Sequence, residues 1–426
     1  MKILWINGSP LPDFAYYLGL KEGGGLWLVR LSKVISEAVQ ENNQLIVICA
    51  VPKKSMEKKV KIGKICYIGI YSRNKAHSYS KEFSKKVKEV IQDNTPDIIH
   101  IWGTENEFSY CSFKAAEEIG YKKKTIVSLQ GIVSIIAIHY FTGIPIKYVM
   151  NFTLSEIAKR KNIYFQAKEF SRRGIYEQYV IKNCPNIVGR TLWDKAYALE
   201  LNRQCNYYIS NETLRDSFYG PKWDIDKCER HSIFMSSSGY PVKGVHMMIK
   251  ALRIVKQVYP DVQLYVPGKN RITSKASERL RFNSYDRYIY RLIDEYELQE
   301  NITFLGYLSE KEMLKRYLNA NVFVSASLIE NSSNAIGEAM ILGVPVVASC
   351  VGGIQSLLEH GREGLLYSVD EPHMLARYVL DIFENDCKAL RLSEEGRKRA
   401  LITHSLDKNF SELMKVYMSV IEKASD

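Results

Sequence analysis

The chain has 426 residues, of which 46% are hydrophobic and 25% are charged. This composition excludes a disordered protein, and the length predicts two domains because it exceeds what one ordinary core organises. The N-terminus "MKILWINGSP" has too short an apolar segment for a signal peptide, and no apolar run approaches the roughly 18 residues that span a membrane. The eight cysteines form no CxxC pair, so we expect reduced thiols in the cytoplasm, without disulfides or a zinc site.

The net charge of +12 is concentrated in the first half of the chain. Residues 1–222 hold 33 lysines and arginines against 20 acids, whereas the remainder holds 26 against 27. Basic runs at 53–64 and 159–173 belong to this excess. Such a field suits nucleic acid or an anionic membrane surface, although a single basic run is more often a solvated face.

The first half alternates apolar strands with helices of amphipathic pattern. We expect buried strands at 2–7, 44–51, 97–102 and 125–129, and helices at 26–40 and 81–92. Continuous apolar strands that alternate with helices indicate a parallel sheet covered on both faces.

The same alternation restarts in the second half. The pattern predicts strands at 231–237, 262–268, 301–308, 321–327 and 344–349, a helix at 244–258 and a last amphipathic helix over "SLDKNFSELMKVYMSVIEKA". The boundary between the halves falls in "YGPKWDIDKCER" (219–230), where turn residues and charges replace periodicity. The predicted class is therefore α/β, with two doubly wound Rossmann-like domains that bind ligands in a cleft between them, at the carboxyl ends of their strands.

Two loops that follow predicted strands have features of phosphate sites. Gly23, Gly24 and Gly25 precede a helix, where backbone N–H groups can approach an anion, although a merely flexible loop fits the spacing equally well. Lys243 and Gly244 stand between a strand and a helix, where the ammonium can reach a phosphate or simply face water.

The most informative stretch is "LIENSSNAIGEAMILGVPVVAS" (328–349). Ser333 and Asn334 suit the start of a short helix whose first N–H groups can bind a pyrophosphate. Glu330 precedes this helix and Glu338 lies about one turn inside it, so both carboxylates can accept hydrogen bonds from hydroxyls of one ligand. Hydroxyls at both ends and phosphates between them describe a nucleotide sugar. The alternative is that Glu338 is a solvated helix residue.

These segments resemble the retaining glycosyltransferases of the GT-B fold, and in particular glycosyltransferase family 4. The E-x7-E segment 330–338 and "GVPVVASCVGGIQSLLEHGREGLLY" (343–367) are the most specific. Further similar segments occur in the expected order at 96–105, 127–132, 187–196, 211–218, 240–252 and 304–314. "NETLR" and "GRTLWD" are most similar to bacterial polysaccharide-assembling enzymes.

The resemblance implies a domain organisation. Residues 1–222 would form an acceptor-binding Rossmann-like domain and 223–404 a nucleotide-sugar-binding one. The helix 405–426 would cross back and pack on the first domain.

The resemblance also implies roles for single residues. Lys243 and Glu330 would be catalytic, with Lys243 on the donor diphosphate and Glu330 facing the donor sugar. Glu338 would bind the ribose hydroxyls, and the backbone near Tyr307 would bind the base. The donor-binding set as a whole would be Gly24, Gly25, Arg190, Lys243, Tyr307, Glu330, Ser333, Asn334 and Glu338.

The chain departs from the family pattern at two positions. The family usually has an arginine five residues before Lys243, where Ser238 stands, so a second diphosphate cation would come from Arg190 or Arg215. Many members have histidine where Trp102 stands, whereas we expect His100 to be a core strand residue.

The implied activity is the retaining transfer of a hexose or related sugar from a UDP- or GDP-sugar to a hydroxyl of a glycan or lipid-linked acceptor, in cell-surface polysaccharide assembly. No Asp-x-Asp motif stands at a strand end, so we expect no metal and no cofactor. Because the acceptor domain carries the positive excess, we expect peripheral attachment to the inner face of the cytoplasmic membrane through 148–173, and no nucleic-acid partner. The alternatives are a nucleotide-sugar epimerase of the same fold and a non-catalytic basic binding protein.

Overall fold

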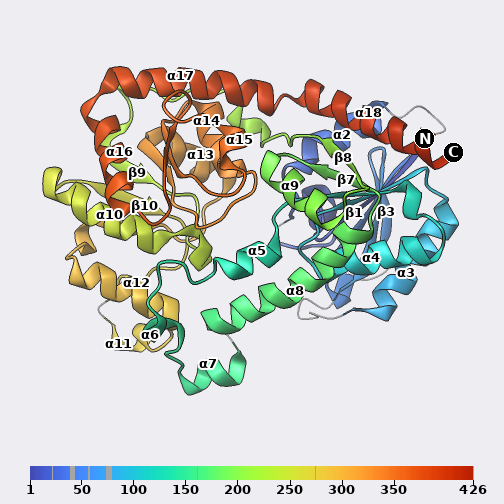
Figure 1. Cartoon of the computed structure of the whole chain (residues 1–426), viewed down its shortest axis with the longest axis horizontal. Coiled ribbons are helices and arrows are strands. Elements are labelled where there is room, and N and C mark those ends of the chain that lie inside the picture. The colour runs from blue at the N-terminus through green and yellow to red at the C-terminus, as the bar shows by residue number, and fades with distance from the viewer. Residues whose placement is uncertain are drawn as a thin grey trace. The chain divides into compact units, whose positions relative to one another are not determined.

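The computed structural model describes residues 1–21, 23–38, 44–55, 58–72, 79–160, 162–273 and 275–425, and it forms two compact units (Figure 1). Unit 1 consists of Met1–Ser134, Ser171–Arg215 and Thr403–Asp426. Unit 2 consists of Ile135–Phe170 and Asp216–Ile402.

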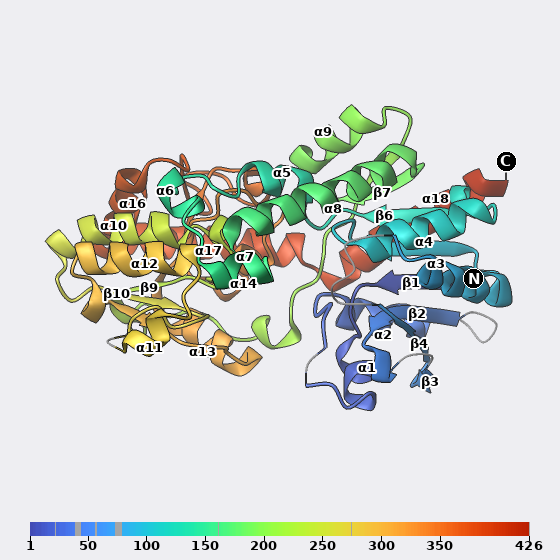
Figure 2. The same cartoon turned by 90° about the horizontal axis from the view of Figure 1, so that it is seen from below.

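Unit 1 is built on one sheet in the order β3-β4-β2-β1-β5-β6-β7-β8, in which only the pair of β3 and β4 is antiparallel among the described strands. Figure 2 shows β1, β2, β4 and β3 side by side. The strands are β1 (Lys2–Asn7), β2 (Gln44–Val51), β3 (Lys59–Ile62), β4 (Ile65–Tyr71), β5 (Ile98–Trp102), β6 (Thr125–Ser128), β7 (Asn186–Gly189) and β8 (Asn206–Ile209).

Helices cover this sheet because its central strands are apolar on both faces. In β1 every residue from Ile3 to Asn7 is buried, which is the pattern of a parallel strand between two helical layers. The helices of unit 1 are α1 (Pro12–Tyr17), α2 (Leu28–Ala38), α3 (Lys81–Asn94), α4 (Glu107–Glu118), α9 (Leu192–Leu201) and α18 (Leu406–Ser425). Helices α5 (Val133–Ile138) and α8 (Ile163–Asn183) each belong partly to unit 1 and partly to unit 2.

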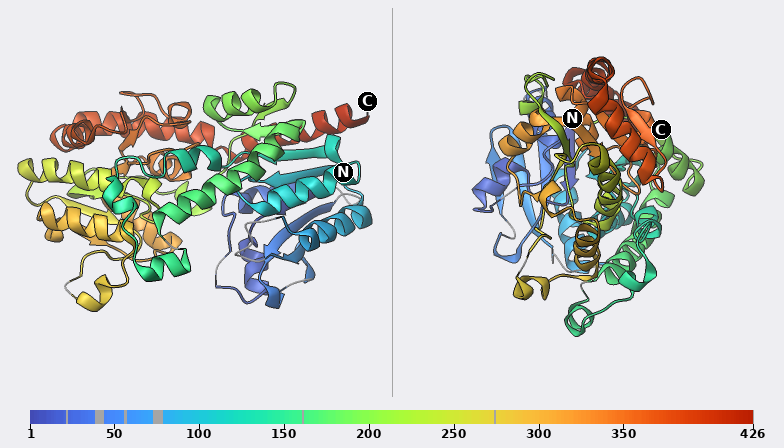
Figure 3. Two further views of the ribbon diagram at one scale, coloured as in Figure 1. Left: turned by 60° about the horizontal axis from the view of Figure 1, so that its bottom comes forward. Right: turned by 90° about the vertical axis from the view of Figure 1, so that its left-hand side faces the viewer.

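The C-terminal helix α18 is part of unit 1, and both chain termini lie there (Figure 3). Its buried Tyr417 hydroxyl accepts a hydrogen bond from Trp5 Nε1 of β1 at 2.9 Å and lies 2.7 Å from His100 Nδ1 of β5. These bonds join the last helix to the two central strands.

Unit 2 is built on a parallel sheet in the order β11-β10-β9-β12-β13-β14. The chain moves outward from β9 to β11 and then returns to β12 and continues to β14, so the strand order reverses between β9 and β12. This is the doubly wound arrangement, with a topological switch point between β9 and β12. The strands are β9 (Glu229–Phe234), β10 (Gln263–Val266), β11 (Ile302–Phe304), β12 (Ala320–Ser325), β13 (Val346–Ser349) and β14 (Leu365–Tyr367).

Capping boxes fix the start of three described helices of unit 2. Ser309 and Asn283 each form a capping box, with Glu312 and Asp286 respectively. The helices are α6 (Ile146–Val149), α7 (Leu154–Lys159), α10 (Val245–Val258), α11 (Ala276–Arg279), α12 (Ser284–Glu295), α13 (Glu310–Asn319), α14 (Asn334–Leu342), α15 (Ile354–Leu357), α16 (Pro372–Glu384) and α17 (Asp386–Thr403), the last of which ends in unit 1.

The segment 135–170 packs with unit 2, although the sequence boundaries group it with residues 1–222. Glu156 caps α7 through Thr153 and also binds Arg287 at 3.1 Å and the backbone N–H of Ser284 at 2.8 Å. The Tyr148 ring packs against Tyr288, with 4.7 Å between the ring centroids and a tilt of 37°. These partners lie on or beside α12, more than a hundred residues away, and periodicity carries no information about them.

The predicted class is confirmed, and each predicted strand overlaps an observed one, although the strands predicted at 262–268 and 301–308 are shorter in the structure. Strands β3, β4, β7, β8 and β14 were not predicted. Lysines interrupt the apolar pattern of β3, whereas β4, "ICYIGIY", is as apolar as the strands that were predicted. The end of the predicted helix 26–40, at residues 39 and 40, lies outside the described residues, as does Lys161 of the basic run 159–173.

Candidate functional site

The carboxyl ends of β9 and β12 are where an open α/β sheet binds ligands, because the crossover helices leave a crevice at the switch point. The loop after β9 carries Lys243 and the loop after β12 carries Glu330. The structure brings these two predicted residues together, with Lys243 Nζ 2.7 Å from Glu330 Oε2. The Ser327 hydroxyl lies 3.3 Å from the same oxygen.

Backbone contacts fix both loops. The Leu328 N–H donates to the Val242 carbonyl at 2.8 Å. Gly244 has φ +69°, and a Cβ at this position would lie 1.7 Å from the Ala326 carbonyl oxygen, so only glycine allows the loops to meet. The Lys243 side chain remains 35% exposed and that of Glu330 19% exposed. The pair is therefore held in place and still open to a ligand.

A third loop, after β13, contacts the backbone of Glu330. The Gly353 N–H donates to the Glu330 carbonyl at 3.0 Å. Gly352 has φ +53°, and a Cβ there would lie 2.0 Å from the Glu330 oxygen. The glycines of "CVGG" therefore have a local reason, which is close approach to the Glu330 backbone.

Helix α14 presents its N-terminus beside this pair. Its N-cap residue Ser333 makes no side-chain capping bond, and no acidic residue occupies its first turn. Glu338, in the second turn, is 7% exposed and lies 3.4 Å from the Tyr317 hydroxyl, which also bonds to the Ala335 carbonyl at 3.1 Å. Glu338 is thus a positioned, buried carboxylate, and the alternative of a solvated helix residue is wrong.

A cavity of about 540 Å³ opens at the carboxyl ends of β9, β10 and β11. Tyr307, in the loop after β11, is 76% exposed and lines it. The lining comprises Ser236, Ser237, Gly239, Pro267, Gly268, Lys269, Asn270, Gly306, Tyr307, Leu308 and Met313. Lys269 follows a predicted strand directly, and this position was the signal in the sequence that could have found it.

Ser238, which stands where the family has arginine, does not line this cavity. It is 1% exposed, and its hydroxyl donates to the Pro267 carbonyl at 2.8 Å. Arg271 Nη2 donates to the Ser238 carbonyl at 3.1 Å.

In unit 1, Arg190 lies after β7 and forms an ion pair with Glu212 at 2.8 Å. Both side chains are 6% exposed, and the Arg190 guanidinium also donates to the Gln130 carbonyl. Glu212 is further tied through its carbonyl to His404 Nδ1 at 2.7 Å, and burial lowers the pKa of His404. Arg215 is half-buried at the end of unit 1.

The glycine loop lies against the segment after β1. A Cβ at Gly24 would lie 2.1 Å from the Ser9 hydroxyl, and one at Gly23 would lie 2.7 Å from Pro12. Gly25 has φ +65°. Packing within unit 1 therefore already accounts for glycine at these positions.

His100 is a fully buried core residue, as predicted. Its ring contacts the Ser128 hydroxyl at 2.7 Å, and burial lowers its pKa to about 3, so the ring is neutral. Trp102 is 7% exposed and packs edge-on against Trp5 at 5.1 Å.

A buried carboxyl in unit 1 was missed by the sequence patterns. Glu177 is 0% exposed and accepts hydrogen bonds from the Val133 and Ser134 N–H groups at 2.9 and 3.2 Å. Burial raises its pKa to about 8. Glu177 pins the chain that follows β6.

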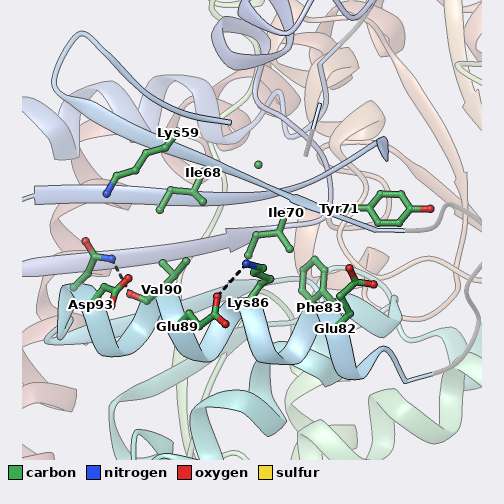
Figure 4. Close-up of a pocket in the computed structure, with 12 residues that line it drawn as sticks. Lys59, Ile68, Ile70, Tyr71, Glu82, Phe83, Lys86, Glu89, Val90 and Asp93 are labelled. Atoms are coloured by element: carbon green, nitrogen blue, oxygen red, sulfur yellow. Dashed lines mark hydrogen bonds and ion pairs between the residues drawn. The ribbon is translucent and has the colours of Figure 1, made fainter. Parts of the chain in front are cut away.

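A second cavity, of about 260 Å³, lies in unit 1 between α3 and the edge strands β3 and β4 (Figure 4). Phe83 and Val90 of α3 face Ile68 and Ile70 of β4 there. Because β2 separates β4 from β1, this cavity lies away from the switch point of unit 1, between β1 and β5.

Solved structures with a similar fold are glycosyltransferases and related synthases. Sucrose-phosphate synthase from Thermosynechococcus elongatus matches 99% of this chain and 100% of its own, with a TM-score of 0.70 and 16% identity. Anabaena HepE in complex with UDP and glucose matches 98% of this chain and 100% of its own, with a TM-score of 0.64 and 16% identity. The fold is the GT-B fold, with two Rossmann-like parts.

The family comparison is specific to the second half. Residues 223–399 match the model of the glycosyl transferases group 1, so the second half of the chain carries a domain of that family, as predicted. The retaining mechanism and the polysaccharide-assembly type stay predictions. Spore coat protein SA of Bacillus subtilis (strain 168) is 25% identical over 178 residues, 41% of this chain and 45% of its own length. The D-inositol 3-phosphate glycosyltransferase of Corynebacterium urealyticum is 24% identical over 42% of this chain and 41% of its own length. The match thus spans less than half of each of these relatives.

None of the described helices is long and apolar enough to cross a bilayer.

Proposed function

We propose that the protein is a retaining glycosyltransferase that moves a hexose or related sugar from a UDP- or GDP-sugar to a hydroxyl of a glycan or a lipid-linked saccharide. The observation that carries the proposal is the Lys243–Glu330 pair at the switch point of unit 2, beside the N-terminus of α14. A cation and a helix N-terminus at the carboxyl ends of neighbouring strands form a site for a diphosphate.

The adjoining groups suit the rest of a nucleotide sugar. The cavity with Tyr307 would hold the base, Glu338 the ribose hydroxyls, and Glu330 the sugar. Ser333 and Asn334 would present the N–H groups that meet the phosphates. Gly24, Gly25 and Arg190 remain predictions, because they belong to unit 1.

The reaction would proceed by departure of the nucleoside diphosphate from the anomeric carbon. Negative charge grows on the diphosphate as the bond breaks, and Lys243 together with the α14 N-terminus would stabilise it. In the proposed reaction the acceptor hydroxyl attacks from the face that the diphosphate leaves, which retains the anomeric configuration, and its proton passes to a phosphate oxygen. No step in this scheme uses a metal ion, so activity should survive an excess of EDTA.

Incubation with UDP- and GDP-sugars, with and without oligosaccharide acceptors, tests the proposal. Free nucleoside diphosphate together with a lengthened acceptor supports a transferase. An epimerised donor without transfer would favour the epimerase, and an unchanged panel would leave only a basic binding protein. An α-linked product from an α-linked donor is the evidence for retention.

We further propose that the acceptor is membrane-associated and that the protein binds an anionic bilayer peripherally, as the sequence predicted for 148–173. We extend the proposed binding surface to the exposed apolar side chains of segment 135–170. Aromatic rings of the predicted stretch pack against one another: the centroid of the Phe152 ring lies 6.0 Å from the centroids of both the Tyr164 and the Phe165 rings. The aliphatic side chains Ile138, Ile146, Met150 and Ile157 are instead 75%, 71%, 50% and 49% exposed. Exposed Lys147, Arg160 and Lys168 accompany them, and each cation near such a surface contributes about 1 kcal/mol.

Flotation with vesicles containing anionic lipid, at low and high salt, tests the membrane claim. We expect flotation at low salt that weakens as salt rises. Ile146→Ser with Met150→Ser should float less, whereas Leu401→Ser with Ile402→Ser, a matched exposed pair on α17, should float like the unaltered protein. A protein that stays in the soluble fraction at low salt would remove the membrane claim and leave the transferase untouched.

A further inference from the structure

Lys269 is the charged residue among the described residues that line the cavity of unit 2. It stands in the loop that follows β10, at the same strand edge as Lys243 and Glu330. Its side chain is 47% exposed, so the ammonium is open to the cavity.

A buried carboxylate holds the Lys269 ammonium. Lys269 Nζ lies 2.6 Å from Asp286 Oδ2, and Asp286 is 4% exposed at the first turn of α12. The Lys269 ammonium also lies 4.8 Å from the centre of the Phe282 ring. A lysine whose ammonium is already held by a carboxylate and a ring loses less conformational entropy when it binds a ligand.

The other carboxylate oxygen of Asp286, Oδ1, is paired with a second cation, Arg271. Arg271 Nε donates to Asp286 Oδ1 at 2.8 Å, and the Arg271 side chain is 5% exposed. Two cations therefore share one carboxylate, which leaves one positive charge in excess. An ammonium has three donors, of which Asp286 uses one and the Arg281 carbonyl, at 3.4 Å, uses a second. The third donor leaves the excess charge available at Lys269, whereas Arg271 is buried.

The loop after β9, which carries Ser238 and Lys243, contacts the loop after β10, which carries Lys269. A Cβ at Gly268 would lie 2.1 Å from the Ser238 hydroxyl, so the residue before Lys269 touches the loop that leads to Lys243. Ser236, Ser237 and Gly239 of that loop line the same cavity as Lys269.

We infer that Lys269 is the second cation for the diphosphate of the nucleotide donor, presented from the β10 loop and restrained by Asp286. Lys269 supplies the positive charge that the family has at the position of Ser238. The sequence suggested Arg190 or Arg215 for this charge. This inference rests on the proposed nucleotide-sugar function, and it assigns Lys269 to phosphate charge rather than to the base.

Calorimetric titration with uridine, UDP, guanosine and GDP tests the assignment without any acceptor. Lys269→Met should weaken binding of the preferred nucleoside diphosphate about tenfold, as loss of one charge-assisted contact does, and should leave binding of the nucleoside unchanged. Lys269→Arg should retain most of the affinity. Lys256→Met removes a partly exposed lysine on α10, whose ammonium donates to the Glu297 carbonyl, and should bind like the unaltered protein.

Each other outcome has a distinct meaning. An equal loss for nucleoside and nucleoside diphosphate would place Lys269 at the base and overturn the inference. Unchanged affinity of Lys269→Met for both diphosphates, with an unaltered unfolding midpoint, would also overturn it. If the unaltered protein binds neither diphosphate, the proposed function fails before Lys269 is tested. Arg271→Met is the folding control, since loss of its buried contacts should lower the unfolding midpoint far more than Lys269→Met.

Discussion

Two ion pairs of nearly equal length lie beyond the sheets of the two units, and they differ in exposure. Arg190 and Glu212 of unit 1 are 2.8 Å apart, with both side chains 6% exposed. Lys243 and Glu330 of unit 2 are 2.7 Å apart, with side chains 35% and 19% exposed. A buried guanidinium–carboxylate pair costs desolvation and is tied to its surroundings, whereas a half-open ammonium can exchange its partner for a ligand.

This difference indicates where charge serves folding and where it serves chemistry. Arg190 is bonded to Gln130 as well as to Glu212, and Glu212 is anchored to His404. Lys243 and Glu330 sit on loops that are fixed by backbone contacts, which Gly244 and Gly352 allow, and their charges remain accessible. We therefore expect substitutions in the first pair to change stability and substitutions in the second pair to change activity.

The largest effect should come from Arg190→Ala. Removing one member of a buried pair leaves Glu212 uncompensated, which costs about 3–5 kcal/mol of unfolding free energy. Urea unfolding measures it, and Arg190→Met with Glu212→Leu should recover much of the loss. If Arg190 binds the donor, as the sequence suggested, the donor KM will instead rise while the unfolding free energy stays close to its normal value.

Lys243→Ala should lower turnover on the order of 10²–10³-fold, because the contact to the diphosphate strengthens as charge develops. Its unfolding free energy should change by only about 1 kcal/mol, since a partly exposed pair contributes little. Initial rates and urea unfolding of the same preparation give both numbers. If Lys243→Ala loses stability but keeps its turnover, the Lys243–Glu330 pair serves folding, as the Arg190–Glu212 pair does, and the contrast fails.

The two carboxylates should separate binding from catalysis by smaller factors. Glu338→Gln should mainly raise the donor KM, roughly tenfold, because a ribose contact is similar in the ground and transition states. Glu330→Gln should mainly lower kcat, because its carboxylate faces the sugar on which charge develops. The opposite kinetic pattern would reverse the two roles.

The smallest effect should appear in the pH dependence of unfolding. The pKa of Glu177 is raised from 4.5 to about 8, so the folded carboxyl keeps a proton that the unfolded one has lost. The stability from this group is full below about pH 4.5 and is lost as pH rises through 8. Between pH 7 and 8.5 the unfolding free energy should fall by about 1 kcal/mol more than in Glu177→Gln. Parallel pH profiles would contradict the raised pKa.

The sequence by itself determined the repeating α/β architecture and the strand edge that carries the site. Buried parallel strands are continuous apolar runs, and their helices start at residues such as Ser309 and Asn283, so neighbours in the chain suffice to place them. Glu330 and Glu338 were found in the same way, because a helix N-terminus and both acids fall within one short stretch.

Only the tertiary structure decided which charged residues are open and which are enclosed. Lys243 and Glu330 are 87 residues apart in the chain, and Arg190 and Glu212 are 22 apart, so no local pattern distinguishes the two pairs. The attachment of segment 135–170 to α12 likewise depends on Arg287 and Tyr288. Lys269 and Arg271 both pair with Asp286, but the Lys269 side chain is 47% exposed and that of Arg271 only 5%. Exposure of a charge is set by residues distant in sequence, since burial is a property of the packed chain and not of the strand or loop that carries the residue.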